Sequence, residues 1–135
     1  MATIYREILI AAHPDAAWSA LRDVGALHTR LAPGFVVDTQ LGDGERVVTF
    51  ANGMVVRELI VDVDDTLRRV AWSVVGSPMT HHNGTAQIVP SGNAQCRFVW
   101  IADLLPHSIA PDIDAMMAEG LAVIKKTLES AAHEH

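Results

Sequence analysis

The side chains best suited to chemistry inside an apolar protein are a glutamate and a histidine. Glu58 lies in the middle of "MVVRELIVDV", residues 54–63, and His82 lies in "HHNGTAQIVP", residues 81–90. A carboxylate and an imidazole facing one dry pocket can act as general acid and base, for instance in aldol closure or dehydration. The same groups can instead orient a hydroxyl or carbonyl of a bound molecule. A third interpretation is that the histidine is only a structural, hydrogen-bonded residue.

Other kinds of chemistry find little support in the sequence. His81 and His82 are adjacent, so in a strand they point to opposite faces and cannot chelate one metal ion together. The single cysteine, Cys96, allows neither a Cys–His cluster nor an internal disulfide. The turn "LGDGE" lacks the lysine and helix of a phosphate-binding loop, and Ser91 lacks the context of a nucleophilic serine. We therefore expect no metal ion and no cofactor.

Composition narrows the functional class. A chain of 135 residues, half of them hydrophobic, fits a single domain over residues 1–135 with a sizeable core. Sixteen acidic against ten basic side chains give a net charge of −6, which disfavours a nucleic-acid groove. The N-terminus does not have the basic start and long apolar run of a signal peptide, and no run approaches the ~20 residues of a membrane span. We expect a cytoplasmic monomer or homodimer without integral membrane association.

The elements that position these side chains follow from turn residues and hydrophobic spacing. Helices are predicted over 13–24, over 25–31 and, with a long apolar stripe, over 109–132. The strand-like runs are 3–12, 35–41, 45–51, 54–63, 67–75, 81–90 and 94–103. Short connections rich in Gly, Asn and Asp join the later runs, as is typical of antiparallel neighbours. The sequence therefore predicts an α+β fold with one seven-stranded antiparallel sheet.

Alternation along three strands predicts which side chains face inward. In each strand the inner set is the bulkier and more apolar one. Because Ala86 and Ile88 belong to such a set, His82 and Gly84 share their inward parity. The other two inner sets are Val70, Trp72 and Val74, and Cys96, Phe98 and Trp100.

Strand 54–63 is ambiguous, because hydrophobicity alone would place Arg57 inside and Glu58 outside. If the turn consists of Asn52 and Gly53 only, Val47 lies opposite Glu58. If the turn is 51–53 with a left-handed glycine, Arg46 lies opposite Glu58 instead. We favour this second register, because an inward carboxylate needs a cationic partner. In the alternative, Glu58 faces solvent and Arg57 extends past the core.

Three stretches carry a resemblance to a known family: "HPDAAWSALRDVGALHTRLAPG", "ERVVTFANGMVVRELIVDVDDTLRRVAWSVVG" and "CRFVWIADLLP". With the order of elements, they resemble the Bet v 1-like or START-like (SRPBCC) superfamily, in particular its bacterial polyketide cyclase/dehydrase branch. The resemblance implies a helix-grip fold, in which a curved sheet wraps around the C-terminal helix and leaves an apolar cavity. It also implies two short helices after the first strand. In the plant hormone-receptor branch, an inward acid occupies the position corresponding to Glu58.

Members of this superfamily include carriers, receptors, enzymes and co-chaperones, so the fold does not choose the function. We expect the chain to bind a small, largely apolar ligand, such as a lipid, a polyketide or an aromatic-like molecule. The alternatives are a cyclase or dehydratase that uses Glu58 and His82, and a co-chaperone-like interaction module without a small ligand. Gly120, in the middle of the helical stripe, either packs closely on the sheet or leaves room for something else. The candidate ligand-binding residues are Arg46, Val56, Glu58, Ile60, Trp72, Val74, His82, Phe98, Trp100, Ile113, Met117, Gly120 and Leu121.

Overall fold

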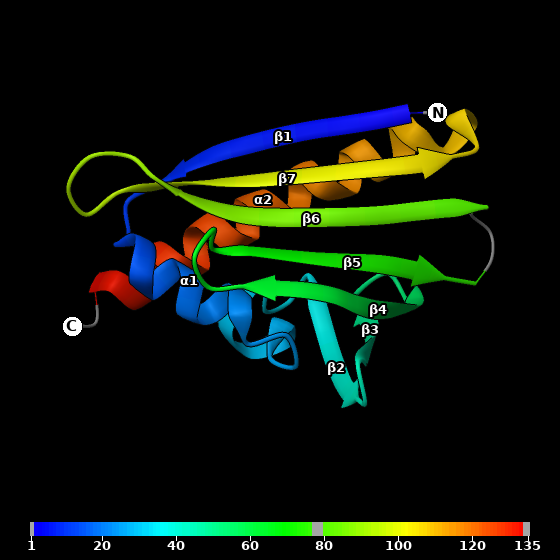
Figure 1. Cartoon of the computed structure of the whole chain (residues 1–135), viewed down its shortest axis with the longest axis horizontal. Helices are drawn as coiled ribbons and strands as arrows, with labels where there is room; N and C mark the ends of the chain where they lie inside the picture. Colours follow the sequence, from blue (N-terminus) through cyan, green and yellow to red (C-terminus); the bar gives the residue numbers. More distant parts are fainter. Residues whose placement is uncertain (1, 77–79, 134–135) are drawn as a thin grey trace.

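A curved antiparallel sheet wraps around a long helix in the computed structural model, which describes residues 2–76 and 80–133 (Figure 1). The sheet has seven strands in the order β1-β7-β6-β5-β4-β3-β2. Among the described strands, β1 and β7 are the only neighbours that are not consecutive in the chain, which leaves β1 and β2 at the edges. The strands are β1 Ala2–Ile10, β2 Val36–Gly42, β3 Glu45–Phe50, β4 Val55–Asp64, β5 Arg69–Val75, β6 His81–Pro90 and β7 Cys96–Leu105. The predicted α+β helix-grip fold is confirmed.

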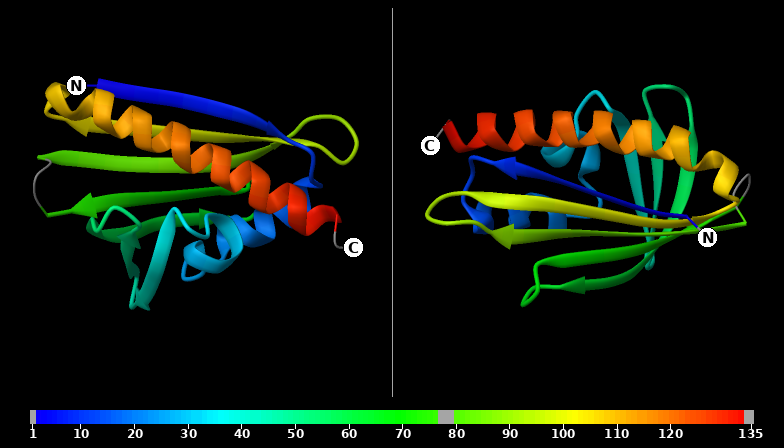
Figure 2. Two further views of the ribbon diagram at one scale, coloured as in Figure 1. Left: turned by 180° about the vertical axis from the view of Figure 1, so that it is seen from behind. Right: turned by 90° about the horizontal axis from the view of Figure 1, so that it is seen from above.

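The helices lie on the concave face of the sheet and at one end of it (Figure 2). Helix α1, Pro14–Arg22, begins with a proline, which needs no helical hydrogen-bond acceptor there. A short π-helical turn, η1 Leu27–Leu31, follows α1. A 3₁₀ turn, η2 His107–Ile109, leads into the long helix α2, Ala110–His133, which crosses the sheet diagonally.

The turn between β3 and β4 determines which charged side chain faces inward. Arg46 pairs with Glu58 across the two strands, which confirms the favoured register. The turn 51–53 contains Gly53 at φ +90°, a left-handed conformation that favours glycine. Arg57 consequently lies on the opposite face of β4, where it bonds Glu45 (Nε–Oε2 2.6 Å). Hydrophobicity alone would have predicted the wrong face for this strand.

Polar contacts fasten α2 to the edge strand β1. The guanidinium of Arg6 makes two hydrogen bonds to Asp114, at 2.6 and 3.1 Å. Farther along the helix, Lys125 Nζ donates to the carbonyl of Leu9 at 2.9 Å. Glu129 accepts a bond of 2.8 Å from a backbone amide just past β1. The helix is thus tied to one side of the sheet, and these bonds also occupy polar groups at the edge of β1.

The packing of α2 on the sheet explains the mid-helix glycine. A Cβ atom at Gly120 would lie 3.0 Å from a ring carbon of Phe35 and 3.1 Å from one of Trp100. The two rings therefore take the space that a larger side chain would need. Gly120 therefore packs closely on the sheet and does not leave empty space beside the helix.

Candidate functional site

Two adjoining chambers lie between the sheet and α2, and each encloses about 500 Å³ of space not filled by atoms, part of it open to solvent. The side chains common to both are Phe35, Phe50, Glu58, Trp72 and Trp100, which form a waist between them. The cavity inside each chamber is small, about 60 Å³ in one and about 70 Å³ in the other. That is room for a few water molecules, so a larger molecule requires side chains of the waist to move.

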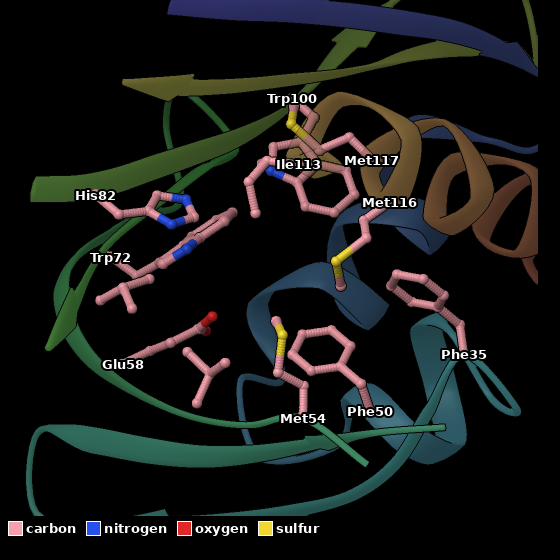
Figure 3. Close-up of a pocket in the computed structure, with 12 residues that line it drawn as sticks. Phe35, Phe50, Met54, Glu58, Trp72, His82, Trp100, Ile113, Met116 and Met117 are labelled. Atoms are coloured by element: carbon pink, nitrogen blue, oxygen red, sulfur yellow. The ribbon is translucent and has the colours of Figure 1, made fainter. Parts of the chain in front are cut away.

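The chambers differ in what else lines them. One chamber, shown in Figure 3, is named the outer chamber. It is lined in addition by Met54, Val56, Val74, His82, Ile113, Met116 and Met117. The inner chamber extends under α1 and η1 and is lined in addition by Leu21, Leu27, Leu31, Ala32, Val36, Arg46, Val48, Ala86, Phe98 and Ile124. Unbranched methionines near the outer chamber provide an adaptable wall. Both linings are predominantly apolar, as is typical of sites for small molecules.

A buried ion pair joins the neighbouring strands β3 and β4. Arg46 Nε donates to Glu58 Oε1 at 2.7 Å, and the two residues are only 4% and 7% exposed. Arg46 Nη1 also donates to the carbonyl of Val24 at 3.2 Å. The guanidinium carbon stands 5.4 Å from the ring centre of Trp72, in cation–π range. Each charge thus has a partner, and Arg46 is held from three sides.

Trp72 owes its position to a glycine on the neighbouring strand. Trp72 pairs with Gly84 across β5 and β6, and a Cβ atom at Gly84 would lie 2.5 Å from the indole. Only glycine at this position therefore leaves room for the indole ring against β6. The ring centre of Trp72 is 6.5 Å from that of Trp100, with the planes inclined by 60°. The two indoles form a tilted aromatic wall, as the inward parity of both strands predicts.

Glu58 and His82 line the same chamber but do not form a direct pair. Glu58 lies opposite Val74 on β5, and His82 lies on β6, the next strand. Two strand spacings separate their backbones, roughly 10 Å. Figure 3 shows the two side chains with the Trp72 ring between them in this view. The carboxylate of Glu58 bonds Arg46, so any joint chemistry would need a substrate that spans the gap.

Burial lowers the pKa of His82, and the nearby His81 lowers it further. The imidazole of His82 is therefore neutral at neutral pH and can accept a proton or a hydrogen bond. In contrast, burial raises the pKa of the Cys96 thiol, which keeps it protonated and unreactive.

Most of the predicted ligand-binding residues line one of the chambers. These are Arg46, Val56, Glu58, Trp72, Val74, His82, Phe98, Trp100, Ile113 and Met117. Ile60, Gly120 and Leu121 line neither chamber: Leu121 is buried in the core, Ile60 packs against that core, and Gly120 is covered by aromatic rings. The ligand-binding roles of all these residues stay predictions.

Sequence reasoning missed four side chains around the outer chamber: Phe35, Phe50, Met54 and Met116. Met116 sits one residue before Met117 and four before Gly120, so its helical spacing could have indicated it. Phe35 and Phe50 meet edge to face, with ring centres 5.5 Å apart. That contact joins a loop to the end of β3, and local patterns do not predict it.

Within residues 2–76 and 80–133, no group of three or more His, Cys, Asp or Glu side chains is placed to hold a metal ion. Among the helices of the same residues, none is long and apolar enough to span a bilayer.

Comparisons with known proteins agree with the architecture. The family model described as polyketide cyclase / dehydrase and lipid transport matches residues 1–132. No curated protein matches the chain in sequence. A solution NMR structure from Thermobifida fusca is 23% identical, with a TM-score of 0.80 over 99% of this chain and 95% of its own. At such identities the likeness shows the fold alone.

Two further solved structures come from proteins with described activities. The di-domain ARO/CYC BexL from the BE-7585A biosynthetic pathway is 20% identical, with a TM-score of 0.80 over 96% of this chain and 47% of BexL. The norcoclaurine synthase of Thalictrum flavum, solved with dopamine and hydroxybenzaldehyde, is 22% identical, with a TM-score of 0.73. That match covers 99% of this chain and 87% of the synthase.

Proposed function

Since the chain belongs to the polyketide cyclase/dehydrase and lipid transport family, we propose that it binds a small, largely apolar molecule between the sheet and α2. The observation that carries this proposal is the pair of chambers. The described residues that line them are apolar except for Arg46, Glu58 and His82. An interior that only supported the fold would be expected to be filled, because an unfilled apolar space destabilises a protein. The waist of aromatic side chains and the nearby methionines provide surfaces that can rearrange around a ligand.

Native mass spectrometry of the protein purified from its own host tests this proposal. We expect part of the protein to carry one noncovalent adduct that organic solvent extracts as a single apolar compound. Val74→Trp fills the outer chamber and should remove the adduct. Val75→Trp is the matched control, because Val75 pairs with Arg57 on the opposite face of the sheet. An adduct that survives Val74→Trp in a folded protein, or a protein without any adduct that also binds no apolar probe, would contradict the proposal.

Catalysis of a ring closure or dehydration is the second candidate function. It is supported by the neutral imidazole of His82 and the carboxylate of Glu58 on one chamber wall. The two candidates differ in the fate of the ligand: a carrier releases it unchanged, whereas an enzyme converts it. Glu58→Gln and His82→Gln should abolish conversion while leaving the apolar lining intact.

An interaction module without a small ligand is the third candidate. Val55, Leu59 and Val61 of β4 are exposed to solvent and offer an apolar patch for a partner protein. The interior chambers argue for a small ligand instead, because a module that works only through its surface has no use for them.

A further inference from the structure

The buried ion pair between Arg46 and Glu58 lines the inner chamber and uses only part of its hydrogen-bonding capacity. The half-exposed pair Arg6–Asp114 is bidentate: Nε and Nη2 of Arg6 each donate a hydrogen bond to one carboxylate oxygen of Asp114. In Arg46–Glu58, Nε makes its bond at 2.7 Å, but no described residue bonds Arg46 Nη2 or Glu58 Oε2. Nη2 lies on the same edge of a guanidinium as Nε, and Arg46 presents this edge to Glu58.

The two atoms without these bonds, Arg46 Nη2 and Glu58 Oε2, are not fully buried. No side-chain nitrogen or oxygen of the described residues is both buried and without a hydrogen-bond partner. Arg46 Nη2 and Glu58 Oε2 therefore keep some contact with free space, although their residues are among the most buried charged ones. Among the described residues, Arg46 and Glu58 are the only charged ones that line the inner chamber. The inner chamber thus has one hydrogen-bond donor, Arg46 Nη2, and one acceptor, Glu58 Oε2, in the same ion pair and in otherwise apolar surroundings.

We propose, on the basis of the ligand-binding function above, that the ligand is a neutral aromatic molecule whose hydroxyl group sits between Glu58 Oε2 and Arg46 Nη2. A hydroxyl donates one hydrogen and accepts others, so it satisfies both atoms at once. A methyl group there would leave both atoms without partners. A ligand carboxylate would be repelled by Glu58, and a ligand ammonium by Arg46. The neighbouring indoles of Trp72 and Trp100 favour an aromatic ring over an aliphatic chain.

Three probes of similar shape test this inference: 2-naphthol, 2-methylnaphthalene and 2-naphthoate. Their dissociation constants are measured by following the indole N–H signals of Trp72 and Trp100 in NMR titrations. The wild-type protein should bind 2-naphthol about tenfold or more tightly than 2-methylnaphthalene, as expected for bonds to charged groups. It should also bind 2-naphthol more tightly than 2-naphthoate. In Arg46→Leu with Glu58→Leu, 2-naphthol and 2-methylnaphthalene should bind about equally.

The outcomes separate this inference from the function on which it rests. Equal binding of 2-naphthol and 2-methylnaphthalene to the wild-type protein would overturn the hydroxyl site but leave apolar binding intact. Tightest binding of 2-naphthoate, or a preference for 2-naphthol that survives the double substitution, would also overturn it. Binding of none of the three probes would overturn the hydroxyl site, and it would also overturn the proposed function if the protein carries no adduct in native mass spectrometry. If the double variant does not fold, Glu58→Gln replaces it, and the preference for 2-naphthol should then fall severalfold.

Discussion

Replacing one member of the buried pair should destabilise the protein far more than replacing both. Arg46→Leu leaves the Glu58 carboxylate, 7% exposed, without its cation and leaves the carbonyl of Val24 without a donor. Breaking a buried pair in this way costs about 3–5 kcal/mol. Replacing both residues with leucine removes both charges and fills similar volume. We expect the double variant to lie much closer to the wild type, because such replacements are often neutral.

Urea unfolding of the wild type, both single variants and the double variant gives the coupling energy between the two positions. The matched control is the pair Arg57–Glu45, which joins the same two strands on the opposite face. The side chain of Arg57 is 57% exposed, so its coupling to Glu45 should be only about 0.2–1 kcal/mol. A coupling energy between Arg46 and Glu58 no larger than that of the control pair would refute the reasoning.

Three further predictions follow from the packing and protonation of the same interior. Gly84→Ala should destabilise the protein by about 1–3 kcal/mol in urea unfolding, because the added Cβ would lie 2.5 Å from the Trp72 indole. Adding Trp72→Phe should recover part of this loss, and an unchanged stability of Gly84→Ala would contradict the contact. Met117→Asp should abolish the cooperative thermal transition, because it puts an unpaired charge at a position only 1% exposed, and a wild-type melting temperature would refute the core assignment. Because the pKa of His82 is lowered in the folded state, the unfolded chain binds this proton more readily. The free energy of unfolding should therefore fall as the pH drops below 6.5, the ordinary pKa, and level off below the lowered pKa. An equal dependence on pH in His82→Gln would exclude His82 as the cause.

Much of this fold could be predicted because local signals agree with the global arrangement. Turn residues mark the strand ends, and the apolar stripe of 109–132 matches the buried face of α2. The inward position of Glu58 was harder to predict, since Val55 and Leu59 share the face of Arg57 and remain exposed. A single left-handed glycine in the turn, and the need of a carboxylate for a cation, outweigh hydrophobicity there.

The shape of the cavity could not be predicted in the same way. Phe35 and Phe50 reach the waist through the geometry of a loop and a strand end, which no periodicity records. Gly120 illustrates the same limit: its space is taken by rings from two other elements. Alternation along strands tells which side chains face inward, but not which of them touch one another and which leave space.

The binding of an apolar molecule inside the protein can be tested most directly by NMR contacts between protein and probe. Intermolecular nuclear Overhauser effects are measured between 2-methylnaphthalene and the methyl groups of methionine, valine and leucine. The proposed function predicts contacts to Met54, Met116 and Met117, which line the outer chamber. Contacts confined to Val55 and Leu59 on the exposed face of β4 would contradict it, as would the absence of any contact at saturating probe.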